Sequence, residues 1–152
     1  MSIVQVGGSG GRTITDSDVG LAPLADLDRI GTISLGGRAA EALLLGAPSA
    51  GAVGDLAKVT GLLLSAHGTA GLGDSLLHRA SERDAHMLLN VDPKPRRTID
   101  AHLQRLYATA LAKIEAQRSR TKQIAEALLR RRFLSHDEVQ ALAHRNPVEG
   151  FL

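Results

Sequence analysis

The side chain best placed for chemistry in this 152-residue sequence is the carboxylate of Asp55. It follows a loop of small residues, Ser49 to Gly54, and opens an apolar stretch that predicts a helix over about 55–67. A carboxylate there has two interpretations. It can be an oxygen ligand for a metal such as zinc, or it can simply favour the helix start, where free N–H groups and the helix dipole attract acids. The residues alone favour the second interpretation, because aspartate is common at helix starts.

Histidine is the other side chain suited to metal binding or proton transfer, since the chain contains no cysteine. A zinc endopeptidase helix carries His-Glu-x-x-His, which places two imidazoles on one face. None of the six histidines begins that motif, and no two of them stand four positions apart. Asp74, His78 and Glu82 do have helical spacing, but two arginines lie nearby and no further ligand is visible. We interpret these three residues as a solvated helix face.

The elements that must position these residues are mainly helices. Leu- and Ala-rich composition favours helix over strand, and the apolar pattern predicts four helical segments before the C-terminus. The first three cover about 23–45, 55–67 and 74–89. The fourth is an apolar stripe from Ile99 to Leu129, which is either one helix or two with a kink near Gln117. Ser135 and Glu138 form a capping box that opens a final helix over about 136–144. Gly46 and Pro48 are expected to stop the first helix.

Residues 1–16 are expected to form a small β-hairpin around the glycine-rich turn at 7–11. That turn lacks the Lys-Ser or Lys-Thr that a phosphate-binding loop requires. We therefore predict a mainly α fold: a peptidase-type domain over 1–145, with a hairpin at 1–16, a helical core at 22–145 and a loose tail at 146–152.

Two adjacent glycines, Gly36 and Gly37, fall inside the first predicted helix. Each costs roughly 1 kcal/mol relative to alanine in a helix interior, so we expect close packing of another element there. Arg38 and Glu41 are three positions apart, a spacing that allows an exposed ion pair, and we interpret both as structural residues.

Charge is distributed unevenly along the chain. Residues 94–132 carry eleven basic and three acidic side chains, whereas residues 1–93 carry six basic and ten acidic ones. A basic helical segment is compatible with nucleic acid or anionic lipid, but aromatic residues for base stacking are nearly absent. We interpret it as a solvated or subunit-facing surface. No apolar run is long enough to span a bilayer, and the absence of cysteine fits a cytoplasmic protein.

Several motifs in order resemble the peptidase domain of the FtsH-type ATP-dependent zinc metalloproteases. The resemblance runs from about Leu27 to Leu142 and includes Gly-Gly-Arg-Ala-Ala-Glu at 36–41, Gly-Thr-Ala-Gly-Leu-Gly at 68–73 and Ile-Ala-Glu-Ala-Leu-Leu at 124–129. In that family the loop before the second helix usually reads Ser-Thr-Gly-Ala-x-Asn-Asp-Leu. Here Ala50 and Gly54 replace the usual Thr and Asn, and the acid is kept as Asp55. The resemblance therefore implies that Asp55 is the third zinc ligand.

The same resemblance indicates what the chain lacks. The family's His-Glu-x-x-His helix precedes the hairpin, so it is expected upstream of Met1, and we expect no catalytic residue in this chain. One carboxylate cannot make a closed zinc site, so the chain alone is expected to be inactive and to hold no zinc tightly. It would be either a truncated piece or a subunit that has lost its metal helix.

For the full-length protein the resemblance implies zinc in the complete domain and ATP in a separate ATPase module. It also implies unfolded protein substrates, a homo-oligomeric ring expected to be a hexamer, and a location at the cytoplasmic face of a membrane. Membrane contact would come only through parts outside this chain, and no nucleic-acid partner is expected. Two alternatives stay open: a non-catalytic assembly module with the same fold, and a basic helical protein that binds nucleic acid.

Overall fold

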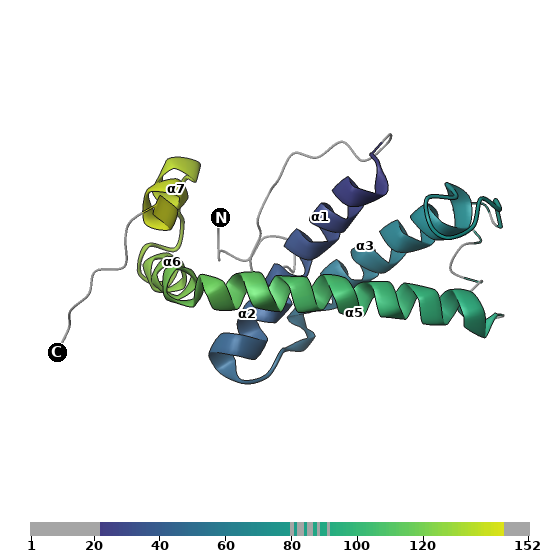
Figure 1. Ribbon diagram of the computed structural model, residues 1–152. Helices are drawn as coiled ribbons and strands as arrows, with labels where there is room; N and C mark the ends of the chain where they lie inside the picture. The colour runs from purple at the N-terminus through teal and green to yellow at the C-terminus, as the bar shows by residue number, and fades with distance from the viewer. Residues whose placement is uncertain are drawn as a thin grey trace. The chain divides into compact units, whose positions relative to one another are not determined.

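The computed structural model describes residues 22–79, 81, 84, 87, 89, 90 and 92–144, most of which are helical (Figure 1). This confirms the prediction of a mainly α chain. The described residues up to Lys113 form one compact unit, and those from Ile114 onward form another. The predicted hairpin at 1–16 and the predicted tail at 146–152 lie outside the described residues.

The first predicted helix is divided into α1 (Leu24–Ser34) and α2 (Gly36–Leu45). Backbone hydrogen bonds still cross the break, because the Leu35 N–H donates to Gly31 O at 3.0 Å and the Ala39 N–H donates to Leu35 O at 3.0 Å. The prediction of one uninterrupted helix over 23–45 is thus wrong at Leu35, which separates the two helices. Gly46, with φ of 83°, ends α2 as expected, because a left-handed residue is the usual stop signal.

The close packing expected at Gly36 and Gly37 is not found. A methyl group added at either position would meet no atom within 4 Å. The two glycines directly follow the break between α1 and α2, where their low helix propensity fits an interruption. The glycine that does permit close approach is Gly31, whose added methyl would lie 2.7 Å from Leu106 Cδ1 and 3.2 Å from Val59 Cγ1.

Three helices therefore meet at Gly31: α1, α3 (Val53–Leu64) and α5 (Pro93–Ala116). Figure 1 shows α1 and α3 crossing the longer α5. Apolar side chains from these helices and from α2 form the core of this unit. The largest contributors are Leu27, Ile30, Leu35, Val59, Leu63, Leu64, Ile99 and Leu106.

The helix that carries Asp55 has irregular turns at both ends. A short 3-10 turn, η1 (Ala50–Ala52), leads into α3, and a π-helical turn, η2 (Ser65–Thr69), follows it. The wider turn of η2 is closed by the Ala70 N–H, which donates to Ser65 O at 2.8 Å. Turns of this kind often lie at functional sites, and η2 contains His67.

The segment after η2 departs from the sequence prediction. Residues 74–79 form no helix, so the prediction of a helix over 74–89 is wrong for that part. The chain instead folds back on η2, where the Arg79 N–H donates to Gly68 O at 2.7 Å and His78 Nδ1 lies 3.0 Å from Thr69 O. Asp74 and His78 therefore do not share a helix face, and Glu82 lies outside the described residues.

The second unit is formed by α6 (Arg118–Arg131) and α7 (His136–His144). A break at Gln117 separates α5 from α6, which confirms the two-helix alternative. The predicted capping box is present: the Ser135 N–H donates to Glu138 Oε2 at 2.8 Å, and the Glu138 N–H donates to Ser135 Oγ at 3.3 Å. Both helices pack around a small apolar cluster of Ala127, Leu128 and Leu134, bordered by Ile124, Val139 and Leu142.

Candidate functional site

The loop that leads to Asp55 is held by Glu41 of α2. The Ser49 N–H donates to Glu41 Oε2 at 2.7 Å, and the Ser49 hydroxyl donates to Glu41 Oε1 at 2.9 Å. These bonds, the backbone one first, lower the pKa of the Glu41 carboxyl. Ser49 Oγ in turn accepts the Gly51 N–H at 3.1 Å, so one carboxylate fixes the turn that enters η1.

Arg38 does not form the ion pair with Glu41 that the spacing allows. Its guanidinium carbon lies 5.9 Å from the centre of the Tyr107 ring, which is a cation–π contact. The Arg38 charge still contributes weakly to the lowered pKa of Glu41. Arg38 therefore ties α2 to α5, while Glu41 ties α2 to the loop.

Asp55 is exposed in the first turn of α3, which is the helix-start position that the sequence predicted. Its carboxylate is chemically suited to a metal, but one ligand does not make a site. Among the described residues, no group of three or more histidine, cysteine, aspartate or glutamate side chains is arranged to hold a metal ion. These residues do not fit a complete zinc site, and no catalytic step through zinc is derived from them. The role of Asp55 as a ligand stays a prediction.

A second group of polar side chains joins three helical elements. His67 of η2, His102 of α5 and Asp28 of α1 form a hydrogen-bonded row. His67 Nε2 lies 2.9 Å from His102 Nδ1, and His102 Nε2 lies 2.7 Å from Asp28 Oδ1. The two rings meet edge to face, with an interplanar angle of 88°.

The positions of the hydrogens in this row follow from the carboxylate of Asp28 at its end. A carboxylate only accepts, so His102 Nε2 carries the hydrogen that it donates to Asp28. In neutral His102 the other nitrogen, Nδ1, then accepts from His67 Nε2, which leaves His67 Nδ1 as a proton acceptor. Arg105 approaches the same His102 nitrogen at 2.7 Å, but that nitrogen already donates, so we assign the arginine to Asp28 Oδ2 at 3.3 Å.

Sequence reasoning did not identify this row. His102 is only 4% exposed, yet it stands three residues after Ile99 and four before Leu106 on an apolar stripe. A histidine at such a position needs a hydrogen-bond partner once the stripe is buried, and this was the available signal. The partner itself was not readable, because Asp28 lies 74 positions away.

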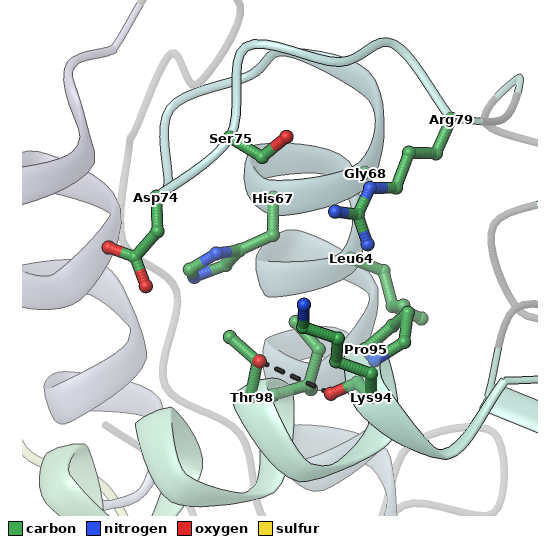
Figure 2. Close-up of a pocket in the computed structure, with 10 residues that line it drawn as sticks. Leu64, His67, Gly68, Asp74, Ser75, Arg79, Lys94, Pro95 and Thr98 are labelled. Atoms are coloured by element: carbon green, nitrogen blue, oxygen red, sulfur yellow. Dashed lines mark hydrogen bonds between the residues drawn. The ribbon is translucent and has the colours of Figure 1, made fainter.

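His67 also lies on the wall of a cavity of about 310 Å³. The cavity is bounded by the end of α3 with η2, by the loop at 74–79 and by the first turns of α5 (Figure 2). Gly73 covers the His67 ring closely, because a methyl group added there would clash with His67 Nδ1. Burial is the main cause of the lowered pKa of His67, and the adjacent His102 lowers it further, whereas Asp74 and Asp28 oppose the change.

The arrangement fixes one imidazole and gathers charged groups around a small hollow. This cavity and Asp55 lie at opposite ends of α3, because Asp55 belongs to its first turn and His67 follows its last turn. The described structure therefore contains two separate candidate features on one helix: the Asp55 loop and the His67 cavity.

The basic segment at 94–132 is partly neutralised by acids within it and by Glu138, which follows it. Ion pairs join Arg118 to Glu115 at 3.4 Å, Lys122 to Glu126 at 3.9 Å and Arg131 to Glu138 at 2.5 Å. These pairs do not favour the nucleic-acid alternative, since carboxylates interrupt the positive surface that a phosphate backbone requires.

Comparison with known proteins gives the class. Residues 16–142 match peptidase family M41, which is most of the chain. The chain belongs to this family of zinc metallopeptidases.

The particular relatives are FtsH proteases. The chain is 38% identical over 130 residues to the ATP-dependent zinc metalloprotease FtsH 1 of Symbiobacterium thermophilum, which covers 80% of this chain and 20% of the relative. It is 35% identical over 123 residues to the chloroplastic ATP-dependent zinc metalloprotease FTSH 2 of Oryza sativa subsp. japonica, covering 71% of this chain and 18% of the relative. The corresponding protein of Arabidopsis thaliana is 32% identical over 122 residues. The chain thus spans about a fifth of the length of these relatives.

Proposed function

We propose that this chain is the part of an FtsH-like peptidase domain that supplies one zinc ligand, Asp55, to a proteolytic site. The observation that supports this most directly is the position of Asp55. It is exposed in the first turn of α3, after a loop that Glu41 holds in place, within a chain that belongs to family M41. An exposed carboxylate on an anchored turn is free to bind a metal presented by another segment.

The remaining ligands and the general base would come from a His-Glu-x-x-His helix that these 152 residues do not contain. The chain alone is therefore inactive toward peptides and binds zinc weakly.

The wider setting is proposed from the relatives, which are ATP-dependent zinc metalloproteases. We infer that the full protein uses ATP in a separate module, degrades unfolded proteins, assembles as a homo-oligomeric ring and works at the cytoplasmic side of a membrane. No helix among the described residues is both long enough and apolar enough to cross a bilayer. Attachment would accordingly use other segments.

The test is fragment complementation with zinc. The chain is co-expressed with the segment of the Symbiobacterium relative that contains its metal-binding helix, and cleavage of an unfolded, fluorescently labelled casein is followed with and without zinc. We expect zinc-dependent cleavage by the pair and none by the chain alone. Asp55→Asn should reduce cleavage by about 100-fold or more, because even outer-shell partners of a metal site contribute roughly 10–100-fold.

Asp100→Asn is the matched control, since Asp100 is an exposed aspartate on α5. Equal activity of the two variants would remove Asp55 from the metal site. Chelator-sensitive cleavage by the chain alone would show that the active centre is complete without the added helix.

A further inference from the structure

Two cationic side chains converge on the cavity beside His67. Arg79 comes from the loop after η2, and Lys94 comes from the first turn of α5. Figure 2 shows the Arg79 guanidinium and the Lys94 ammonium pointing into the same space. Their backbones are fixed, because the Arg79 N–H donates to Gly68 O at 2.7 Å and the Lys94 N–H donates to Asp92 Oδ1 at 2.9 Å.

The charge of these two side chains is not balanced within the cavity. Among the described residues, neither forms an ion pair with a carboxylate. Asp74, the acid that lines the cavity, lies on the His67 side in Figure 2. With His67 neutral, the lining carries a net charge of +1 from Arg79, Lys94 and Asp74. Two like charges that share a hollow repel each other, and an anion placed between them relieves that repulsion.

Part of the cavity lining is apolar. It is formed by Leu64, Pro95 and Ile99, of which Leu64 is 2% and Ile99 3% exposed. Small-molecule sites typically combine such a wall with a few placed polar groups in volumes of roughly 300–1,000 Å³. The cavity here, at about 310 Å³, is at the small end of that range.

We propose that this cavity binds a small aliphatic carboxylate. The carboxylate lies between Arg79 and Lys94, and the aliphatic group packs against Leu64, Pro95 and Ile99. The guanidinium matches a carboxylate in two parallel hydrogen bonds, and the ammonium adds a point charge. The proposal depends neither on zinc nor on Asp55, so it goes beyond the proteolytic role and can fail separately from it.

The test uses N-acetyl-leucine as the probe and N-acetyl-leucine amide as its uncharged match. Amide chemical shifts of the full 152-residue chain are followed by NMR while each compound is added. We expect saturable changes at His67, Gly68 and Thr98 with the acid, with a dissociation constant of roughly 1–10 mM for a ligand of this size. The amide should bind at least about fivefold more weakly, because it lacks the charge.

Variants locate the binding. Arg79→Gln and Lys94→Gln each remove one cation from an exposed position and should weaken the binding of N-acetyl-leucine at least about fivefold. Lys58→Gln and Arg97→Gln, exposed cations that do not line the cavity, should leave its binding unchanged.

Equal binding of acid and amide would overturn the proposal, as would unaltered titrations of the Arg79 and Lys94 variants. Inorganic phosphate is added in a separate titration. Saturation of the same amides by phosphate but not by the acid would refute the aliphatic part and hence the proposal. A lack of any saturable change with the acid would also reject it.

Discussion

Gly31→Ala is the substitution for which the structure gives the clearest magnitude. The new methyl group would lie 2.7 Å from Leu106 Cδ1 and 3.2 Å from Val59 Cγ1, where ordinary contacts begin at 3.4 Å. The contact with Leu106 must therefore lengthen by about 0.7 Å, and Leu106 is only 3% exposed. Overpacking of this kind costs about 1–3 kcal/mol, because neighbouring side chains leave their preferred rotamers.

A second effect has the opposite sign. Alanine is favoured over glycine in a helix interior by about 1 kcal/mol. The net loss in free energy of unfolding for Gly31→Ala is thus between about 0 and 2 kcal/mol. Gly37→Ala provides the matched control, since Gly37 is exposed in α2 and a methyl there meets nothing within 4 Å. That variant should be stabilised by up to about 1 kcal/mol.

The difference between the two variants isolates the clash, which should amount to about 1–3 kcal/mol. Urea unfolding followed by far-ultraviolet circular dichroism measures it, with the same slope expected for both variants. If Gly31→Ala is as stable as Gly37→Ala, then α1, α3 and α5 do not meet at Gly31 as described. The packing of α1 against α5 that positions Asp28 beside His102 would then also be wrong.

Three further predictions concern single groups. Because the pKa of His67 is lowered in the folded chain, the unfolded chain binds more protons, and the free energy of unfolding should fall as the pH drops below the ordinary value of 6.5. His67→Gln should flatten this pH dependence in urea titrations. An NMR titration that places the His67 pKa above 6.5 would contradict this prediction. Because the pKa of Glu41 is also lowered, its bonds to Ser49 should be present above the ordinary value of 4.5 and be lost as the pH falls through the lowered value. Glu41→Gln should speed amide exchange at Ser49 and Gly51 at neutral pH, and unchanged exchange would refute the anchoring role. Ser135→Ala should cost about 1 kcal/mol by removing the cap of α7, which faster amide exchange at Glu138 would report and equal exchange would disprove.

Much of the helical framework was readable from local sequence signals. The apolar pattern located the helices that became α1, α3 and α5, and Gly46 and the Ser135–Glu138 box marked an end and a start. Asp55 was placed correctly at a helix start. These features depend on residues within a few positions of one another, so no knowledge of packing is needed to predict them.

The failures share one cause. A helix was predicted over residues that fold back on η2, and close packing was expected at Gly36 and Gly37 instead of at Gly31. Helical spacing gives the faces of a helix, but it does not say which other element each face will meet. A contact such as Gly31 with Leu106 is decided between helices.

The sequence by itself determined a mainly helical chain of the FtsH peptidase type, with an acid at the start of one helix and a capped helix near its end. Only the tertiary structure joined Asp28, His67 and His102. His67 lies 35 positions from His102 along the chain, and Asp28 lies 74 positions from His102. It also turned Arg79 and Lys94 toward one cavity. The physical reason is range: propensities, caps and periodicity act over one or two turns, whereas a row of hydrogen bonds between helices exists only after those helices have packed.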